Sequence, residues 1–285
     1  MSRCVLVLVV LLAGCKDKTP SPSGLAERVR DKITATLPDV TVKIQDPRTL
    51  LVRRGDYDVT MNLDNLATTC RGGEVVCNDA IAGAIANIKL ADDKAQVVKP
   101  EQLVITIKPG QWFLDTDKML KEKAPEQYEV NKLVAQLLPG DLVAVLGADH
   151  SNGITMVSAE QLREMKLEAN AAFAQARKNL KATHETLDLE LLAGTPVWTN
   201  RSDDNYISAM IMLPELWKPL AAKVKGDLLV AFPARNRVFA TGTKDPGAEE
   251  GIAKIANVAF QTEDHPIAPT IFKWSATSWT VHEIR

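Results

Sequence analysis

The spacing of apolar residues along the chain predicts a mixture of helices and strands. Over residues 25–37 apolar side chains recur every four positions, which predicts a helix that ends at Pro38. Runs of β-branched or alternating residues over 40–44, 50–53 and 57–63 are separated by turn residues and predict three strands in a meander. The first part of the chain therefore predicts a small antiparallel sheet covered by a helix.

Further elements are predicted up to residue 157. Apolar residues at helical spacing predict helices, and short apolar runs predict strands. In chain order, these elements are a helix over 78–90, a strand over 103–108, a helix that carries Val130, Leu133, Val134 and Leu137 and ends at Pro139-Gly140, and strands over 141–146 and 154–157.

A helix start is marked at Ser158, because Ser158 and Gln161 form the pattern of a capping box. The apolar positions from Leu162 to Leu180 predict one long helix, which we expect to join two halves of the molecule. The elements expected after it are strands over 187–192, 197–199 and 206–213, a helix from Pro214, a hairpin over 227–241, a helix after Asp245-Pro246 and a closing strand over 270–283.

Two similar segments begin at Gly140 and Gly226, 86 residues apart, and each leads into a two-strand unit. Together with the order of elements, they predict an α+β fold of two consecutive modules, each an antiparallel sheet covered by helices. The predicted modules are residues 25–157 and 158–285, joined by the long central helix. The order of elements from Ser158 onward is similar to that of secretion-chaperone-like domains.

The first fifteen residues have the pattern of an export signal, with Arg3 before a short apolar run. The run Leu12-Ala13-Gly14-Cys15 resembles the lipobox of bacterial lipoproteins. The resemblance implies removal of residues 1–14, acyl chains such as palmitate on Cys15, and stable membrane anchoring. Residues 15–24, rich in proline and serine, predict a flexible tether. An ordinary signal peptide with a chance cysteine is the alternative.

The residue after Cys15 and the net charge of the chain bear on where the protein lies and what it binds. Lys16, and not aspartate, follows Cys15, which in the enterobacterial sorting rule favours the outer membrane; we expect its periplasmic face. Loss of Arg3 with the signal leaves 33 lysines and arginines against 36 aspartates and glutamates, so the mature chain is nearly neutral. This balance argues against nucleic acid as a partner, since such proteins usually carry a strongly basic face. We therefore expect contact with a membrane through the lipid anchor.

Each of the four cysteines has an expected role. Cys4 leaves with the signal and Cys15 is acylated, so Cys70 and Cys77 remain. Two cysteines this close in an oxidising compartment predict a disulfide. A metal site is the weaker alternative, because the Cys-x-x-Cys spacing and nearby histidines are both missing. We expect no metal or other cofactor.

The second module resembles the YtpQ-like family of bacterial proteins, whose members have no assigned activity. The resemblance rests on the helix from Ala159 through Ala172-Phe173 to Leu180, on the segment 226–233 and on Pro266-Ile267-Ala268-Pro269, and it continues upstream through 103–108. These motifs are structural, so the resemblance implies a shared fold and no catalytic residues. The lipobox departs from the better-known members of the family.

Two short segments contain residue types that catalysis uses. His184-Glu185-Thr186-Leu187-Asp188 begins like the zinc-protease motif, which requires a second histidine at the position that Asp188 occupies. Asp149-His150-Ser151 has the residue types of a hydrolase triad, but adjacent residues do not normally form its linked hydrogen bonds. We interpret the first as a solvated helix end and the second as a polar hairpin tip, and assign no catalytic residue.

Other turns offer polar donors for an anionic group or a peptide. They are Arg235-Asn236-Arg237 and Arg201-Ser202-Asp203-Asp204, for which solvated turns are the alternative interpretation. Phe272, Trp274 and Trp279 alternate along the closing strand, and we interpret them as core rather than as a sugar-stacking surface.

These patterns favour a lipid-anchored envelope protein that acts as a non-enzymatic binding module for an envelope protein or peptide. Two alternatives stay open. One is an envelope hydrolase that uses His184 or the segment around His150, and the other is a structural component of the envelope.

Overall fold

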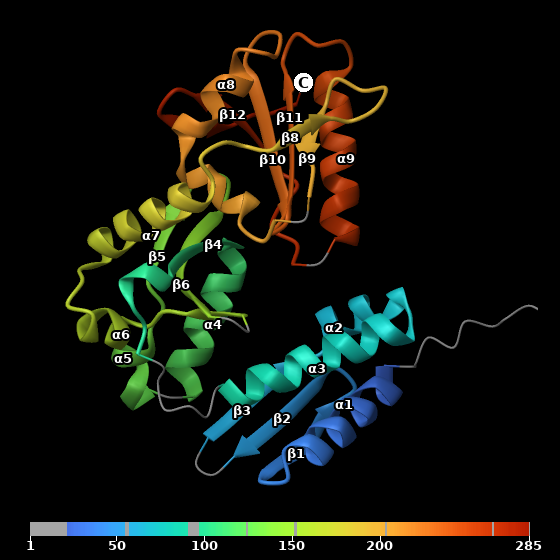
Figure 1. The fold of residues 1–285 in the computed structure, drawn as a ribbon, viewed down its shortest axis with the longest axis vertical. Coiled ribbons are helices and arrows are strands. Elements are labelled where there is room, and N and C mark those ends of the chain that lie inside the picture. Colours follow the sequence, from blue (N-terminus) through green and yellow to red (C-terminus); the bar gives the residue numbers. More distant parts are fainter. Residues whose placement is uncertain are drawn as a thin grey trace, which may run out of the picture. The chain divides into compact units, whose positions relative to one another are not determined.

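The computed structural model describes residues 22–54, 57–90, 97–123, 125–150, 153–202, 204–263 and 265–284. The predicted signal peptide and the predicted lipidation site Cys15 lie outside these residues. The described chain is α+β, as predicted, with antiparallel sheets packed against helices (Figure 1). It divides into two compact units, Met1–Ile85 and Ala86–Arg285, which we call the first and second units.

The first unit is built on a three-stranded meander. Its strands β1 (Val40–Asp46), β2 (Thr49–Arg54) and β3 (Tyr57–Asn62) pair antiparallel in chain order, as predicted. Helix α1 (Pro22–Thr36) packs on β1 and β2 and buries Leu25, Val29 and Ile33, which recur every four residues. This helix begins inside the predicted tether, because a proline is well suited to the first position of a helix.

A disulfide closes the loop between the last helices of the first unit. After α2 (Asp64–Thr69) and a 3-10 turn, η1 (Cys70–Gly72), the chain turns at Gly73 into α3 (Glu74–Leu90). Gly73 has a φ of 111°, which favours glycine. Cys70 and Cys77 are bonded, with Cα atoms 4.1 Å apart. Because α3 starts earlier than predicted, Cys77 lies within its first turns.

The smaller sheet of the second unit has the order β4-β6-β5, with β7 also paired to β6. Its strands are β4 (Leu103–Pro109), β5 (Ala135–Leu138), β6 (Leu142–His150) and β7 (Gly153–Met156). Preceding β4 is the short turn η2 (Pro100–Gln102). Helix α4 (Gly110–Lys123), which the sequence analysis missed, leads through η3 (Pro125–Gln127) and α5 (Tyr128–Asn131) to β5. The predicted helix around Leu133 is therefore wrong, since its apolar residues lie on a short helix, a connector and a strand.

Two helices replace the predicted long central helix. The capping box of Ser158 and Gln161 starts α6 (Ala159–Glu164), with reciprocal hydrogen bonds of 3.3 and 2.9 Å. Lys166 then adopts a φ of 56°, which ends that helix before α7 (Ala169–Thr183) begins. Instead of joining two modules, α7 packs on β4.

The larger sheet of the second unit has six strands in the order β13-β12-β10-β11-β9-β8, all in antiparallel pairs. Helix α9 packs on β10 and β11 (Figure 1). The bounds of these elements are β8 Leu189–Leu191, β9 Trp198–Asn200, β10 Leu228–Ala234, β11 Arg237–Gly242, α9 Ala248–Thr262, β12 Ile271–Ser275 and β13 Ser278–Val281.

Two predicted strands differ from the structure. The run over 206–213 forms the 3-10 helix η4 (Ile207–Met212), which is buried on all sides and contacts both β4 and β11. The closing segment is a hairpin, with Trp274 of β12 opposite Trp279 of β13. Pro214 starts only a short turn, η5 (Pro214–Trp217), followed by α8 (Lys218–Ala221).

An aromatic cluster lies in a core that the two sheets of the second unit share. The rings of Trp217, Phe232 and Trp279 contact one another edge to face, with centroids 5.4 to 5.9 Å apart. Trp217 and Trp279 donate their indole N–H groups to the carbonyls of Met210 and Ile211 in η4. The interpretation of the aromatic residues on the closing segment as core is confirmed for Phe272 and Trp279, which are buried.

This common core explains why the predicted boundary between residues 157 and 158 falls inside one unit. The core extends from Val98 to Trp279, so residues on both sides of that boundary bury their apolar side chains together. Among the described residues, no helix combines the length and the apolar character that crossing a bilayer requires.

Replacing both Cys70 and Cys77 by alanine should destabilise the first unit by about 2.5 kcal/mol, through the gain of chain entropy when so short a loop is opened in the unfolded state. Amide hydrogen exchange of the full chain measures this loss of stability. Residues 22–85 of the variant should exchange faster than those of the wild type. Exchange over 97–284 serves as the internal control. Unchanged protection in the first unit would contradict the expectation.

Replacing Phe232 by alanine should lower the free energy of unfolding of the second unit by about 3–5 kcal/mol, because it leaves a cavity between the two tryptophans. Chemical denaturation monitored by tryptophan fluorescence measures the loss. Phe260→Ala on α9 is the matched control, since Phe260 is partly exposed and should cost far less.

Candidate functional site

Four segments that the sequence analysis treated separately come together in the second unit. They are the end of β6 with Asp149, the end of α7 with His184, the turn after β9 with Asp204 and Tyr206, and the turn between β10 and β11 with Arg235. We call these five residues the Tyr206 cluster.

Tyr206 connects the members of the cluster. Its hydroxyl donates to the Oδ2 atom of Asp149 over 2.6 Å, and its backbone N–H donates to the Oδ1 atom of Asp204 over 2.8 Å. Its ring meets the His184 ring edge-on, with centroids 6.3 Å apart. The side chain therefore links a strand of the smaller sheet to the turn that follows the larger sheet's β9.

His184 ends α7 with both ring nitrogens near oxygen atoms. Nε2 lies 2.9 Å from the Oδ2 atom of Asp204, and Nδ1 lies 2.8 Å from the hydroxyl oxygen of Thr183 and 3.2 Å from the Leu180 carbonyl. The Thr183 hydroxyl can donate to that same carbonyl over 3.0 Å, which leaves its oxygen free to accept from Nδ1. The ring is thus placed to donate on both sides when it is protonated.

The surroundings of Tyr206 keep its hydroxyl protonated. Burial raises the pKa of Tyr206 far above its usual value, and the hydrogen bond to Asp149 raises it further. A tyrosine with so high a pKa exchanges its proton poorly at neutral pH. Burial, together with the nearby charge of Arg235, also lowers the pKa of Lys108 at the end of β4. The hydroxyl of Tyr206 therefore suits hydrogen bonding better than acid–base catalysis.

The structure does not assemble either candidate catalytic segment. Asp149 faces Tyr206, whereas the ring of His150 contacts the side chains of Gln102 and Thr155 at 3.3 and 3.0 Å. Ser151 lies outside the described residues. His184 contacts Asp204 rather than Asp188, and no group of three or more metal-ligating side chains occurs in the part of the chain that the structure describes.

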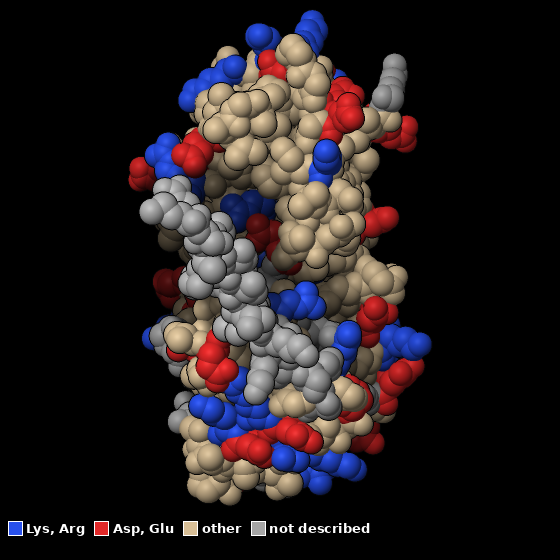
Figure 2. All heavy atoms as spheres, turned by 90° about the vertical axis from the view of Figure 1, so that its right-hand side faces the viewer, with Lys and Arg blue, Asp and Glu red and all other residues tan. Residues whose placement is uncertain are grey.

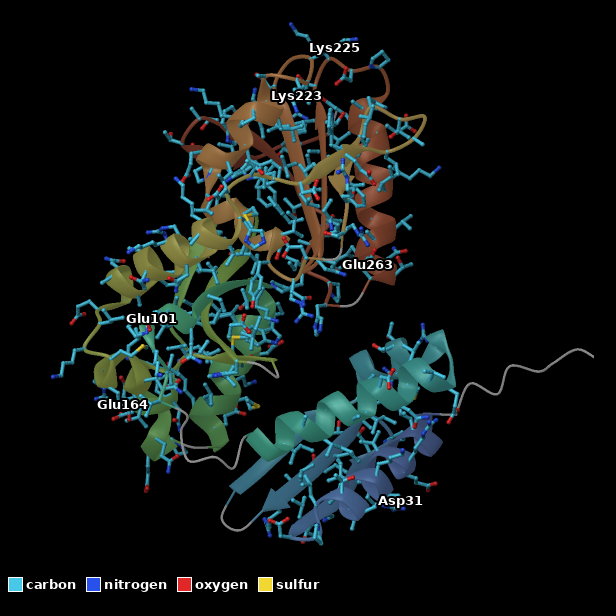
Figure 3. All side chains as sticks on the ribbon, viewed as in Figure 1. Asp31, Glu101, Glu164, Lys223, Lys225 and Glu263 are labelled. Carbon is cyan, nitrogen blue, oxygen red and sulfur yellow. A yellow bond between two sulfur atoms is a disulfide. The ribbon has the colours of Figure 1, made fainter. Side chains whose placement is uncertain are left out.

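The polar turns are engaged in ion pairs. Arg201 reaches Asp188 and Glu190 at 3.6 and 3.3 Å and so braces the start of β8. Arg237 donates to Glu263, which Figure 3 labels just beyond α9, over 3.0 Å. Asp203 lies outside the described residues. The ion pairs of Arg201 are exposed to solvent, which fits the interpretation as a solvated turn, whereas Arg237 and Glu263 are partly buried.

Next to the Tyr206 cluster, β8 forms an edge of the six-stranded sheet, where it pairs with β9 (Figure 1). Leu191 and Leu192 at the end of β8 are 52% and 37% exposed. Leu191 lies opposite Trp198, whose ring is covered by the ammonium group of Lys223 at 5.6 Å. We call Leu191, Leu192, Trp198 and Lys223 the β8 edge.

The backbone of β8 has a defined orientation at this edge. The N–H of Leu192 donates to the Val197 carbonyl over 2.7 Å, so Leu192 points its polar groups toward β9. Since these groups alternate in direction along an antiparallel strand, the N–H and C=O of Leu191 point away from β9, toward the open side. The sequence analysis did not identify this edge, because a three-residue strand carries too little pattern to show which side it leaves open.

Replacing Tyr206 by phenylalanine should lower the free energy of unfolding by about 1 kcal/mol at neutral pH, because Asp149 loses its donor. A raised tyrosine pKa stabilises the fold below the unfolded value of about 10, and this contribution is lost as the pH rises beyond it. The difference in unfolding free energy between wild type and variant should therefore shrink in alkaline solution.

Urea denaturation of both proteins at several pH values measures this difference. Tyr128→Phe is the comparison variant, since the hydrogen bond that Tyr128 donates to Asp117 also raises its pKa, whereas burial contributes most to the raised pKa of Tyr206. The pH-dependent difference should therefore be larger for Tyr206→Phe than for Tyr128→Phe. A difference between wild type and Tyr206→Phe that stays constant into alkaline solution would count against the role given to Tyr206.

Comparison of this chain with family models, with curated proteins and with solved structures found no match. The resemblance to the YtpQ-like family therefore stays a prediction.

Proposed function

We propose that this protein is a lipid-anchored envelope protein whose second unit binds an extended segment of a protein or peptide partner. In this proposal the partner segment adds to the six-stranded sheet as a further strand alongside β8. The observation that carries the proposal is the open side of β8, where backbone groups and exposed leucines occur together.

The chemistry of the edge supports binding of an extended peptide. A strand at the edge of a sheet offers unpaired N–H and C=O groups, and proteins usually protect such edges with charge or proline when they serve no partner. Here β8 carries one charged residue, Glu190, beside the exposed Leu191 and Leu192. Added strands gain affinity from main-chain hydrogen bonds and specificity from side-chain contacts, for which Leu191 and Trp198 supply an apolar surface.

The charges near the edge favour a polar peptide over nucleic acid. Arg201, Asp188 and Glu190 at the start of β8 offer charges of both signs to such a segment. On the face shown in Figure 2, basic and acidic side chains are interspersed rather than separated by sign. This face therefore shows no large basic area of the kind that nucleic-acid binding uses.

The hydrolase alternative has less support. Its candidate residues His150 and His184 contact different partners, and the hydroxyl of Tyr206 holds its proton firmly. A structural role in the envelope would also use a lipid anchor, but it gives no reason for an open apolar edge at β8.

A photoreactive amino acid at position 192 tests the proposal in the envelope of the source bacterium. Irradiation should give one specific adduct. Leu191→Pro removes the N–H that points to the open side, where proline is tolerated in an edge strand. It should reduce the adduct roughly tenfold, as expected for the loss of one or two main-chain hydrogen bonds.

Two controls make the result specific. Leu191→Ala keeps the N–H and should reduce the adduct less than the proline variant does. A photoreactive residue at Val258, which is 52% exposed on α9 like Leu191 on β8, should not give the adduct. The same adduct from position 258, or an undiminished adduct in Leu191→Pro, would refute binding at β8.

A further inference from the structure

Two valines at the start of α3 are exposed and contribute little to the core of the fold. Val75 is 74% exposed and Val76 is 44% exposed. The disulfide between Cys70 and Cys77 closes the loop that carries them, so they sit on a rigid part of the surface. Arg71 in the same loop is exposed as well. The loop therefore presents apolar side chains beside a cation.

This loop lies at the end of the first unit where α1 begins. Arg28, in the first half of α1, pairs with Glu74 at 2.6 Å and donates to Asn78 over 3.0 Å. These contacts place the start of α3 beside the start of α1. Figure 1 shows the first residues of α1, α2 and the start of α3 together at one end of the unit. The ion pair also neutralises the carboxylate of Glu74.

The tether between the proposed lipid and this end is short. Six residues, 16–21, separate Cys15 from Pro22, where α1 begins. Fully extended, each residue spans at most about 3.3–3.6 Å, so these six residues reach about 20–22 Å. A first unit anchored through Cys15 therefore stays close to the lipid surface, with the start of α1 held nearest to it.

We propose that the Cys70–Cys77 loop rests on the membrane and inserts Val75 and Val76 among the lipid headgroups, with Arg71 next to the lipid phosphates. This inference rests on the proposed lipid anchoring at Cys15. Two valines bind a bilayer weakly by themselves, but the anchor holds them at a high local concentration, so their contact only has to set the orientation of the unit. The disulfide keeps the loop in shape for that contact.

Fluorescence quenching tests the orientation. The lipidated full chain is placed in vesicles of phosphatidylethanolamine and phosphatidylglycerol that contain nitroxide-labelled lipid. A new cysteine is introduced by Val76→Cys or, as a control, by Ala35→Cys, and each is labelled with an environment-sensitive fluorophore. Ala35 is exposed near the other end of α1, about 20 Å from Pro22 along the helix.

Quenching at position 76 should exceed quenching at position 35 several-fold. Val75→Asp in the Val76→Cys protein should remove most of that excess, because a charge opposes insertion. Equal quenching at both positions, or stronger quenching at position 35, would overturn the inference.

Failure of the anchoring itself gives a different result. A wild-type chain that does not sediment with vesicles, or that takes up the thiol-reactive fluorophore at Cys15, would contradict lipidation. A chain that sediments while both probes stay unquenched would leave lipidation supported and would refute the membrane contact of the loop.

Discussion

The packing of Trp217, Phe232 and Trp279 is the contact on which the second unit depends. The three rings come from η5, from the central strand β10 and from the final hairpin, so they hold together segments that are far apart in the sequence. Large aromatic side chains bury much apolar area in specific edge-to-face geometry. Both indole N–H groups are also satisfied by carbonyls of η4, which fixes that short helix at the same time.

The position of the candidate site follows from this arrangement. Tyr206 immediately precedes η4, and η4 is held between β4 of the smaller sheet and β11 of the larger one. The hydroxyl of Tyr206 can therefore reach Asp149 at the end of β6 while its backbone N–H binds Asp204. These bonds fix the turn after β9, and the N–H of Arg201 in that turn donates to the carbonyl of Asp188 just before β8.

Local patterns predicted the elements whose apolar residues face one side. The meander, α1, β4 and the hairpin of β10 and β11 appear where the pattern placed them. The prediction of a strand over 206–213 was wrong because a short apolar run occurs both in buried strands and in buried helices. Lys166 ends a helix in a left-handed conformation that glycine or asparagine usually adopts, so the break between α6 and α7 left no signal.

The site was predictable only in pieces. The segments with Asp149, His184, Asp204 and Arg235 were each recognised as candidates. The bonds that join them cross long stretches of chain, such as the sequence separation of 57 between Asp149 and Tyr206. Spacing along the sequence contains no information about such contacts. Tyr206 itself was hidden in an apolar run, where it resembled one more core residue.

The chain-order pairing of β1, β2 and β3 affects the order in which the two units can fold. All strand pairs of that meander join near neighbours, which favours rapid folding, and this unit is synthesised first. The six-stranded sheet, in contrast, needs Trp279 from its last strand to complete the core. The first unit can thus reach its final form before the end of the chain completes the sheet whose edge we propose binds a partner.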